Sequence, residues 1–553
     1  MVSHFWIEAA VIIVAVVLTG LSRAHACSPA GSSCVVGTGT PPSCSEAALD
    51  AALVGGGAVT FNCGSGVTIT VTSTKTITVD TAIDGGGLVT LSGGNTVAVF
   101  AVGAMLSVEN LTIANGNDEL YGCAGGICNE SGTVTVANST FSANASGMGS
   151  GGIANLSGML MVINSTFSDN SGGLTGGGGI VSHFGGTLLV IDSTFTGNGA
   201  SAGGGGIYND GGTATIANSS FFSNSTSHGY GGGIANGITG TVVVTSSTFA
   251  NNAALGGPLG GGGLGNQGTA TITNSTFAAN STGRFYGGGG VGNSYGGTAT
   301  ITNSTFSGNT TGGTPGGNIS NGFGSLTITN SIVANGTSSD NCGGAITDGG
   351  HNIQFPDNTC GATIDSADPL LDPTGLADNG GPTLTIALLP DSPAINAGDQ
   401  TVCGTTTGAA PVGNLDQRSF VRPGQGSTHC SIGAFEFASV AATPSSTPTA
   451  SPTPTITPTR PPQSPTGTTT PTATPTSTPP ATPTPTASAT PTHGACVGDC
   501  NGDGEVTVNE LVQMTNIALG FLPLSTCVAG DANMDGEITV NEIIAAVNNA
   551  LSS

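Results

Sequence analysis

The sequence contains few cations and few aromatic residues. Only six of its 553 residues are Lys or Arg and one is Trp, whereas 31 are Asp or Glu, which gives a formal net charge of −25. Nucleic acids and anionic membranes bind proteins through clustered cations. The composition therefore argues against nucleic acid as a partner. Sequence pI is about 4.1.

Long hydrophobic runs are also rare. The apolar run from Ala9 to Leu18 is too short to cross a bilayer, and Ala24-His25-Ala26 follows it as a small-x-small site. Residues 1–26 are therefore predicted to be a cleaved signal peptide, which leaves an exported chain without a transmembrane segment. Cys27 directly follows the predicted site, so lipidation of this residue is an alternative.

Thirteen Cys residues in an exported chain indicate disulfides and an oxidising compartment. Sequence does not fix their connectivity, and the odd number leaves at least one thiol unassigned. The local pairs that we predict are Cys44 with Cys63, Cys123 with Cys128, Cys342 with Cys360, and Cys403 with Cys430.

A repeated phrase organises the middle of the chain. Asn-Ser-Thr-Phe, with small variations, returns every 26 to 29 residues between residues 138 and 333, together with Gly-Gly-(Ile/Leu/Val)-x-Asn and short runs such as Thr-Ala-Thr-Ile. Runs that alternate with period two and are rich in Thr, Val and Ile are typical of short strands. Because the period is nearly constant, we predict stacked coils. The fold class is all-β: a right-handed parallel β-helix with two or three strands per coil.

The repeated Phe residues are predicted to point inward and stack from coil to coil. They are Phe141, Phe167, Phe195, Phe221, Phe249, Phe277 and Phe306.

The repeated Asn residues allow three interpretations. Their amides could form a hydrogen-bonded ladder along the solenoid. Those followed by Ser-Thr could instead accept N-linked glycans, and these are Asn138, Asn164, Asn274 and Asn303. A row of Asn on a flat face could also bind a ligand.

Composition and periodicity divide the chain into six segments. Residues 27–116 are predicted to form an N-terminal cap and the first coils, with a short helix in the pattern Ser45 to Leu53, and residues 117–339 the regular coils. Residues 340–440 are predicted to form a loop-rich cap in which Arg418 and Arg422 pair with Asp399, Asp416 or Glu436. Residues 441–492 form a Thr/Pro-rich spacer, and residues 493–553 a small α-helical domain.

Residues 368–436 resemble the choice-of-anchor Q domain of bacterial surface β-helix proteins. The matching phrases include Asp368-Pro369-Leu370-Leu371, Asp378-Asn379-Gly380-Gly381-Pro382-Thr383, Ser392-Pro393-Ala394-Ile395-Asn396-Ala397-Gly398 and Ile432-Gly433-Ala434-Phe435-Glu436. The resemblance implies an exported protein that is held at a surface. It implies no reaction.

Two loops near the C-terminus have the spacing of calcium-binding EF-hand loops. Oxygen ligands recur at loop positions 1, 3, 5, 7 and 12, with Gly at position 6 for the sharp turn. Two Ca²⁺ ions are therefore predicted. The ligands in the first loop are Asp499, Asn501, Asp503, Glu505 and Glu510, and in the second Asp531, Asn533, Asp535, Glu537 and Glu542.

An amphipathic helix is predicted after each calcium loop, with no good helix before it. This loop-plus-helix pair resembles a dockerin, a calcium module that plugs into cohesin scaffolds. Loop positions 10 and 11, Val508-Asn509 and Val540-Asn541, depart from the usual Ser-Thr type, and Glu stands at position 12. A cohesin-like partner is therefore left open.

No catalytic motif of a polysaccharide-cleaving β-helix was found. Lys75 is the only lysine, and His183 and His228 are interpreted as isolated turn residues. We therefore predict an adhesin-like surface protein that presents an elongated face to a glycan or a neighbouring surface. The alternatives are a polysaccharide-degrading enzyme with a dockerin, of the pectate lyase or glycoside hydrolase type, and a structural surface-layer protein.

Overall fold

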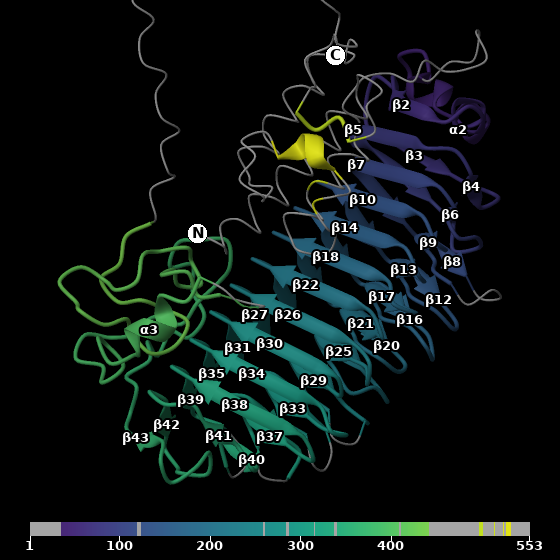
Figure 1. The fold of residues 1–553 in the computed structure, drawn as a ribbon. Coiled ribbons are helices and arrows are strands. Elements are labelled where there is room, and N and C mark those ends of the chain that lie inside the picture. The colour runs from purple at the N-terminus through teal and green to yellow at the C-terminus, as the bar shows by residue number, and fades with distance from the viewer. Residues whose placement is uncertain are drawn as a thin grey trace, which may run out of the picture.

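The computed structural model of the chain is a parallel β-solenoid (Figure 1). It describes residues 35–118, 123–257, 260–283, 287–313, 316–336, 340–406, 408, 411–441, 497–500, 514, 524 and 527–531. The predicted signal peptide, Cys27 and nearly all of the predicted spacer lie outside the described residues. Within the described ranges, no helix is long and apolar enough to cross a membrane.

Each regular coil contains four short strands, not the two or three predicted. The sequence period leaves room for a fourth strand because three of the four strands have only two to four residues. Every strand pairs in parallel with its counterpart in the next coil, in register. One sheet contributes a single strand to each coil and has eleven strands, so the solenoid has about eleven coils.

The long strands are β10 (Thr133–Ala137), β14 (Met159–Ile163), β18 (Thr187–Ile191), β22 (Thr213–Ala217), β26 (Thr241–Thr245), β30 (Thr269–Thr273), β34 (Thr298–Thr302) and β38 (Ser325–Thr329). The corner strands are β11 (Thr140–Ser142), β15 (Thr166–Ser168), β19 (Thr194–Thr196), β23 (Ser220–Phe222), β27 (Thr248–Ala250), β31 (Thr276–Ala278), β35 (Thr305–Ser307) and β39 (Ile332–Ala334).

The two-residue strands are β8 (Asn117–Asp118), β12 (Ala145–Ser146), β16 (Ser171–Gly172), β20 (Gly199–Ala200), β24 (Ser225–Thr226), β28 (Ala253–Ala254), β32 (Ser281–Thr282) and β36 (Thr310–Thr311). The eleven-stranded sheet comprises β4 (Lys75–Ile77), β6 (Phe100–Val102), β9 (Ile127–Asn129), β13 (Ile153–Asn155), β17 (Ile180–His183), β21 (Ile207–Asp210), β25 (Ile234–Asn236), β29 (Leu264–Asn266), β33 (Val291–Asn293), β37 (Ile319–Asn321) and β40 (Cys342–Gly344).

The remaining elements belong to the less regular ends. They are β1 (Val35–Val36), η1 (Pro41–Ser43), α2 (Glu46–Leu53), β2 (Gly57–Phe61), β3 (Val67–Thr70), β5 (Thr81–Ser92), β7 (Met105–Ala114), β41 (Thr347–Asp348), β42 (Ile353–Phe355), β43 (Asp365–Ser366), α3 (Gln400–Cys403) and η3 (Val528–Gly530).

The predicted column of Phe rings forms the centre of the core. From Phe141 to Phe306 successive rings stack with centroids 4.6–4.8 Å apart and planes within 9° of parallel. The second glycine of each Gly-Gly phrase lies against a ring. A Cβ on Gly233 would lie 2.9 Å from Cδ1 of Phe249, so the repeated glycine makes room for the aromatic column.

Two Asn ladders run inside the solenoid and confirm the ladder interpretation for these positions. In one, the Asn that follows each Phe phrase donates from Nδ2 to the Oδ1 of the next coil at 2.8–3.0 Å, as between Asn198 and Asn224, and Asn318 and Asn341 continue the ladder beyond Asn309. In the other, the Asn of the Gly-Gly phrase does the same in every coil but that of β17, where Ser182 replaces it, as between Asn209 and Asn236. These side chains are buried, and all of their amides are hydrogen-bonded as buried polar groups require, except that Oδ1 of Asn209 has no partner.

The N-terminal helix α2 forms where the sequence predicts it. The Ser45 hydroxyl caps the helix by accepting from the backbone N–H of Ala48, and Leu49 and Ala52 are buried against the first coil. All four predicted disulfides are present. A fifth, between Cys500 and Cys527, was not predicted.

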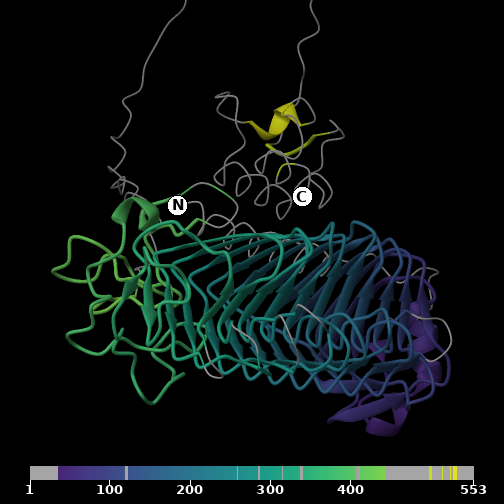
Figure 2. The same cartoon turned by 90° about the horizontal axis from the view of Figure 1, so that it is seen from below.

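The C-terminal cap, which we define as the described residues from 368 to 441, lies along the side of the solenoid. It packs beside the corner strands β27 to β39 (Figures 1 and 2). The Thr248 hydroxyl donates to the Leu384 carbonyl, and the Thr276 hydroxyl to Oε1 of Gln417, both at 2.6 Å. The cap therefore covers one face of the last coils.

Candidate functional site

The structure describes two of the predicted calcium ligands, Asp499 and Asp531. The other eight lie outside the described residues. The Cys500–Cys527 disulfide and a hydrogen bond from the Gly498 N–H to the Ala529 carbonyl, 3.1 Å, join the segments that lead into the two predicted loops. Among the described residues there is no group of three or more His, Cys, Asp or Glu that could hold a metal ion. The two calcium ions stay a prediction.

A row of mostly Asn residues marks the corner between each long strand and its corner strand. We call it the corner row, and its members have φ between +43° and +50°. This left-handed conformation favours Asn among non-glycine residues. The corner row comprises Asn110, Asn138, Asn164, Asp192, Asn218, Ser246, Asn274, Asn303 and Asn330.

The cap covers the C-terminal part of the corner row. The side chain of Asn330 donates to the Asp399 carbonyl at 3.2 Å and accepts from the Asp399 N–H at 2.9 Å. Asn274 donates to the Leu415 carbonyl and Asn303 to Sγ of Cys403, each at 3.0 Å. Asn274 and Asn303 are therefore buried and engaged, so a glycan on either would displace the cap. Asn138 and Asn164 are exposed.

Two buried arginines hold the cap together. Arg418 pairs with Asp416 at 2.6 Å, and Arg422 pairs with Glu436 at 3.0 Å, as two of the predicted alternatives allowed. Asp399 pairs with neither Arg418 nor Arg422; its carboxylate caps α3 by accepting from the Thr401 N–H. These buried ion pairs therefore have a structural role in the cap.

Two carboxyls with raised pKa values lie at the open part of the corner row: Asp192 belongs to the row, and Glu109 directly precedes its first member. Burial raises the pKa of Glu109, and the neighbouring charge of Asp84 raises it further. Burial also raises the pKa of Asp192, although a hydrogen bond with Asn218 opposes the shift. Both carboxyls are thus partly desolvated by the packed coils.

The strongest departure from the repeat is a polar cluster on the outer side of β17 and β21. We define the polar cluster as His183, Tyr208, Asp210 and Tyr230. Nδ1 of His183 lies 3.0 Å from Oδ2 of Asp210 in the next coil. The prediction that His183 is isolated was wrong, because the coil period places residues 27 apart in sequence side by side.

The two tyrosines extend the cluster behind Asp210. Tyr230 packs edge-on against Tyr208 with ring centroids 6.1 Å apart, and His183 packs edge-on against Tyr208 at 5.9 Å. The charge of Asp210 acts on the hydroxyls of both tyrosines. Asp210 is half-exposed and is therefore the carboxylate that the cluster presents to solvent.

The electrostatics of the cluster keep Asp210 charged and the tyrosines neutral. The hydrogen bond with His183 lowers the pKa of Asp210. Burial, together with the charge of Asp210, raises the pKa of Tyr208 to about 12. Burial likewise raises the pKa of Tyr230. The group therefore offers a fixed carboxylate acceptor supported by neutral hydroxyl donors.

The inner Asn ladder is broken beside the polar cluster, and this break lowers stability. Ser182 stands in β17 where neighbouring coils have a ladder Asn, and its Oγ lies 3.5 Å from Nδ2 of Asn155. In the following coil, Oδ1 of Asn209 is buried without a hydrogen-bond partner. An unsatisfied buried acceptor costs free energy. Such local cost is typical of functional sites.

Phe184 lies beside the cluster and is open to solvent. It occupies the turn after β17 with φ +50°, its side chain is 78% exposed, and its ring lies 5.3 Å from that of His183. A bulky residue in the left-handed region is an outlier that the surrounding structure must hold in place. Sequence reasoning missed this site. The available signal was in the Gly-Gly phrase, where Val181-Ser182 replaces Ala-Asn and His183 follows.

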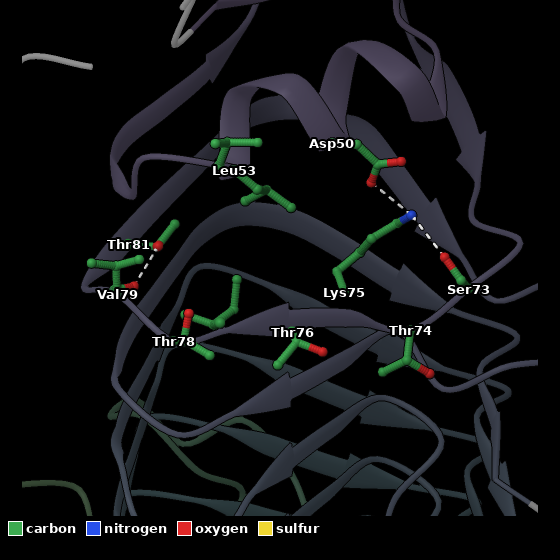
Figure 3. Close-up of a pocket in the computed structure, with 11 residues that line it drawn as sticks. Asp50, Leu53, Ser73, Thr74, Lys75, Thr76, Thr78, Val79 and Thr81 are labelled. Atoms are coloured by element: carbon green, nitrogen blue, oxygen red, sulfur yellow. Dashed lines mark hydrogen bonds and ion pairs between the residues drawn. The ribbon is translucent and has the colours of Figure 1, made fainter. Parts of the chain in front are cut away.

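A pocket at the N-terminal end is lined by an ion-paired lysine, Lys75. The cavity has a volume of about 310 Å³ and lies between α2 and β4 (Figure 3). Nζ of Lys75 contacts Oε1 of Glu46 at 2.6 Å and Oδ1 of Asp50 at 2.7 Å. Because both carboxylates belong to α2, the lysine fastens the helix to the first coils.

Comparison with known proteins assigns no family. No protein-family model matches the chain, and no curated protein matches it significantly. The choice-of-anchor Q and dockerin resemblances therefore rest on the quoted residues alone. What the structure establishes is a parallel β-solenoid of about eleven coils with disulfides.

Proposed function

We propose that the chain is an adhesin-like surface protein whose solenoid binds a glycan at the polar cluster. The observation that carries this proposal is the coincidence at β17 and β21 of an exposed aromatic ring, a fixed carboxylate and a locally unsatisfied ladder. An aromatic face can pack against the C–H face of a sugar ring, and a carboxylate accepts from two sugar hydroxyls. Phe184 and Asp210 supply these two groups.

Surface display is supported by the covalent structure. Disulfides persist in oxidising compartments outside the cytosol, and five are present in the described residues. The predicted spacer and calcium loops would then give attachment. Titration of the full chain with Ca²⁺ by calorimetry should show two sites, and Glu510→Gln or Glu542→Gln should each remove one. Absence of Ca²⁺ binding would end the attachment proposal.

A glycan array probed with the full chain tests the binding proposal. We expect a restricted set of glycans to bind, and the double variant Phe184→Ala/Asp210→Asn to lose at least tenfold in affinity. Asp169→Asn removes an exposed carboxylate elsewhere on the coils and is the matched control. Equal binding by wild type and double variant would overturn the assignment. Release of shorter products during incubation would make the chain a polysaccharide-degrading enzyme.

A further inference from the structure

We infer that the glycan is a neutral, linear polysaccharide that lies parallel to the solenoid axis along a row of exposed turn residues. We call this the turn row and define it as Phe184, Ile238, Tyr295 and Phe323. The inference rests on the proposed function, because Phe184 at one end of the row adjoins the polar cluster. It goes further by naming the class of ligand and the extent of the site.

The coil register stacks these four residues along one edge. Each follows a strand of the eleven-stranded sheet, β17, β25, β33 or β37, and precedes a long strand. Both sets of strands pair in parallel and in register from coil to coil. From the coil of β17 to that of β37 there are five strand spacings, or roughly 24 Å. This length suits an extended chain molecule.

The turn residues are held open to solvent. Their exposed fractions are 78% for Phe184, 68% for Ile238, 55% for Tyr295 and 80% for Phe323. Tyr295 has φ +53°, which is the same left-handed conformation as that of Phe184. The Gly296 N–H donates to the Phe323 carbonyl at 2.9 Å and joins two successive turns. The backbone of these turns would therefore lose little conformational entropy when the ligand binds.

Hydroxyl groups flank the turn row. The first residues of five long strands in these coils are exposed. Thr187, Thr298 and Ser325 follow the turns of Phe184, Tyr295 and Phe323, and Thr213 and Thr269 lie in the intervening coils. Sugars expose apolar C–H faces and a rim of hydroxyls, so a line of apolar side chains beside a line of hydroxyls matches both features. A protein partner would not need this repeated pairing.

The charge of the region selects a neutral ligand. The cations among the described residues are Lys75, Arg418 and Arg422, and each is engaged by a carboxylate. Asp210 is the charged group beside Phe184, and its lowered pKa keeps it anionic. A uronate or sulfated chain would be repelled by Asp210, and each Lys or Arg that the structure describes is already engaged by a carboxylate. Neutral hexose, pentose or N-acetylhexosamine chains meet no such penalty.

Oligosaccharide length series test the inference on the full chain. We would titrate neutral β-1,4-linked cello-, xylo-, manno- and chito-oligosaccharides, from disaccharide to octasaccharide, with oligogalacturonates as the charged comparison. Affinity for one neutral series should rise at least tenfold with length. Tyr295→Ala/Phe323→Ala should remove this gain while leaving disaccharide binding unchanged. Leu174→Ala/Leu255→Ala removes exposed leucines from another edge and is the matched control.

The outcomes separate this inference from the proposed function. Binding that depends on Phe184 and Asp210 but not on length or on Tyr295 and Phe323 would overturn the turn row and leave the proposed function standing. Preference for oligogalacturonate would overturn the neutral class. If no glycan binds, both fall. If sedimentation shows self-association that Tyr295→Ala/Phe323→Ala abolishes, the row is an interface between copies, which also overturns the inference.

Discussion

The same corner row is a structural interface in the C-terminal coils and an open surface in the N-terminal coils. Asn274 and Asn164 come from nearly identical phrases and share the left-handed backbone. Asn274 is buried under the cap, whereas Asn164 is exposed and donates to the Asn138 side chain at 2.7 Å. A repeated phrase therefore fixes local geometry. Its role depends on what packs over it.

The largest expected effect is that the cap detaches from the C-terminal part of the corner row when Arg422 is replaced. Arg422 is fully buried and donates to Glu436, to the Ser431 carbonyl and to the Gly433 carbonyl at 2.7–3.0 Å. Arg422→Ala would leave the Glu436 carboxylate buried without its partner, which costs about 3–5 kcal/mol. Denaturant unfolding and limited proteolysis of the cap would measure this loss. Arg422→Met/Glu436→Leu should be less damaging, and a cap that stays docked in Arg422→Ala would contradict the interpretation.

A matched pair of substitutions compares the two halves directly. Asn274→Ala removes the donor to the Leu415 carbonyl and an acceptor for Arg422. It should cost about 1–3 kcal/mol more than Asn164→Ala, because buried partners are left unsatisfied. Both variants place Ala in the left-handed conformation, so that cost cancels. Equal changes in the free energy of unfolding would show that the cap does not depend on the corner row.

The break in the inner Asn ladder at Ser182 should be repairable by a single substitution. Ser182→Asn would supply the missing amide beside Oδ1 of Asn209 and should stabilise the solenoid by about 1 kcal/mol. Thermal unfolding measures the gain, and Ser182→Ala is the control that cannot donate. If the gap serves the polar cluster, the stabilised variant should also bind glycan more weakly. A loss of stability in Ser182→Asn would show that the coil has no room for the amide.

The smallest effect concerns acid stability at the N-terminal helix. Burial raises the pKa of Glu46, but hydrogen bonds from Lys75 and Thr72 outweigh it and lower the pKa from 4.5 to about 2. Stability from this carboxylate is therefore present above pH 4.5 and lost as pH falls through about 2. Because the pair is partly exposed, it contributes below about 1 kcal/mol.

Melting temperatures of wild type and Glu46→Gln between pH 7 and pH 2 would test this. The difference between the two proteins should shrink as the pH falls. A difference that persists at pH 2 would show that Glu46 acts through something other than its charge. The Arg422–Glu436 pair of the C-terminal cap contrasts with the Glu46–Lys75 pair, because both of its side chains are buried.

Much of the fold could be predicted because its contacts connect residues one coil apart. The Phe column, the inner Asn ladders and the four local disulfides all follow from the period or from short separations in sequence. The number of strands per coil was underestimated because two-residue strands carry almost no pattern. Cys500–Cys527 was missed because Cys500 lies in the first predicted calcium loop and Cys527 lies outside both loops, 27 residues further along the chain.

The candidate site could not be predicted from pattern alone. His183 and Asp210 looked unrelated because neither belongs to a known motif, and only the coil register brings them within 3.0 Å. The exposure of Phe184 and Phe323 likewise depends on how the other described residues pack, since none of them covers these turns. The predicted calcium ligands stay a matter of sequence, since Asp499 and Asp531 alone lie among the described residues.

The sequence by itself determined the coil. Its period, its inward Phe and Asn and its Gly positions are dictated by contacts between neighbouring repeats, which each repeat reproduces. Tertiary structure alone decided which faces are covered. The contact between Asn274 and Leu415 spans 141 residues, and no local preference encodes it. It arises because the cap presents peptide groups and buried arginines that match one half of an otherwise uniform row.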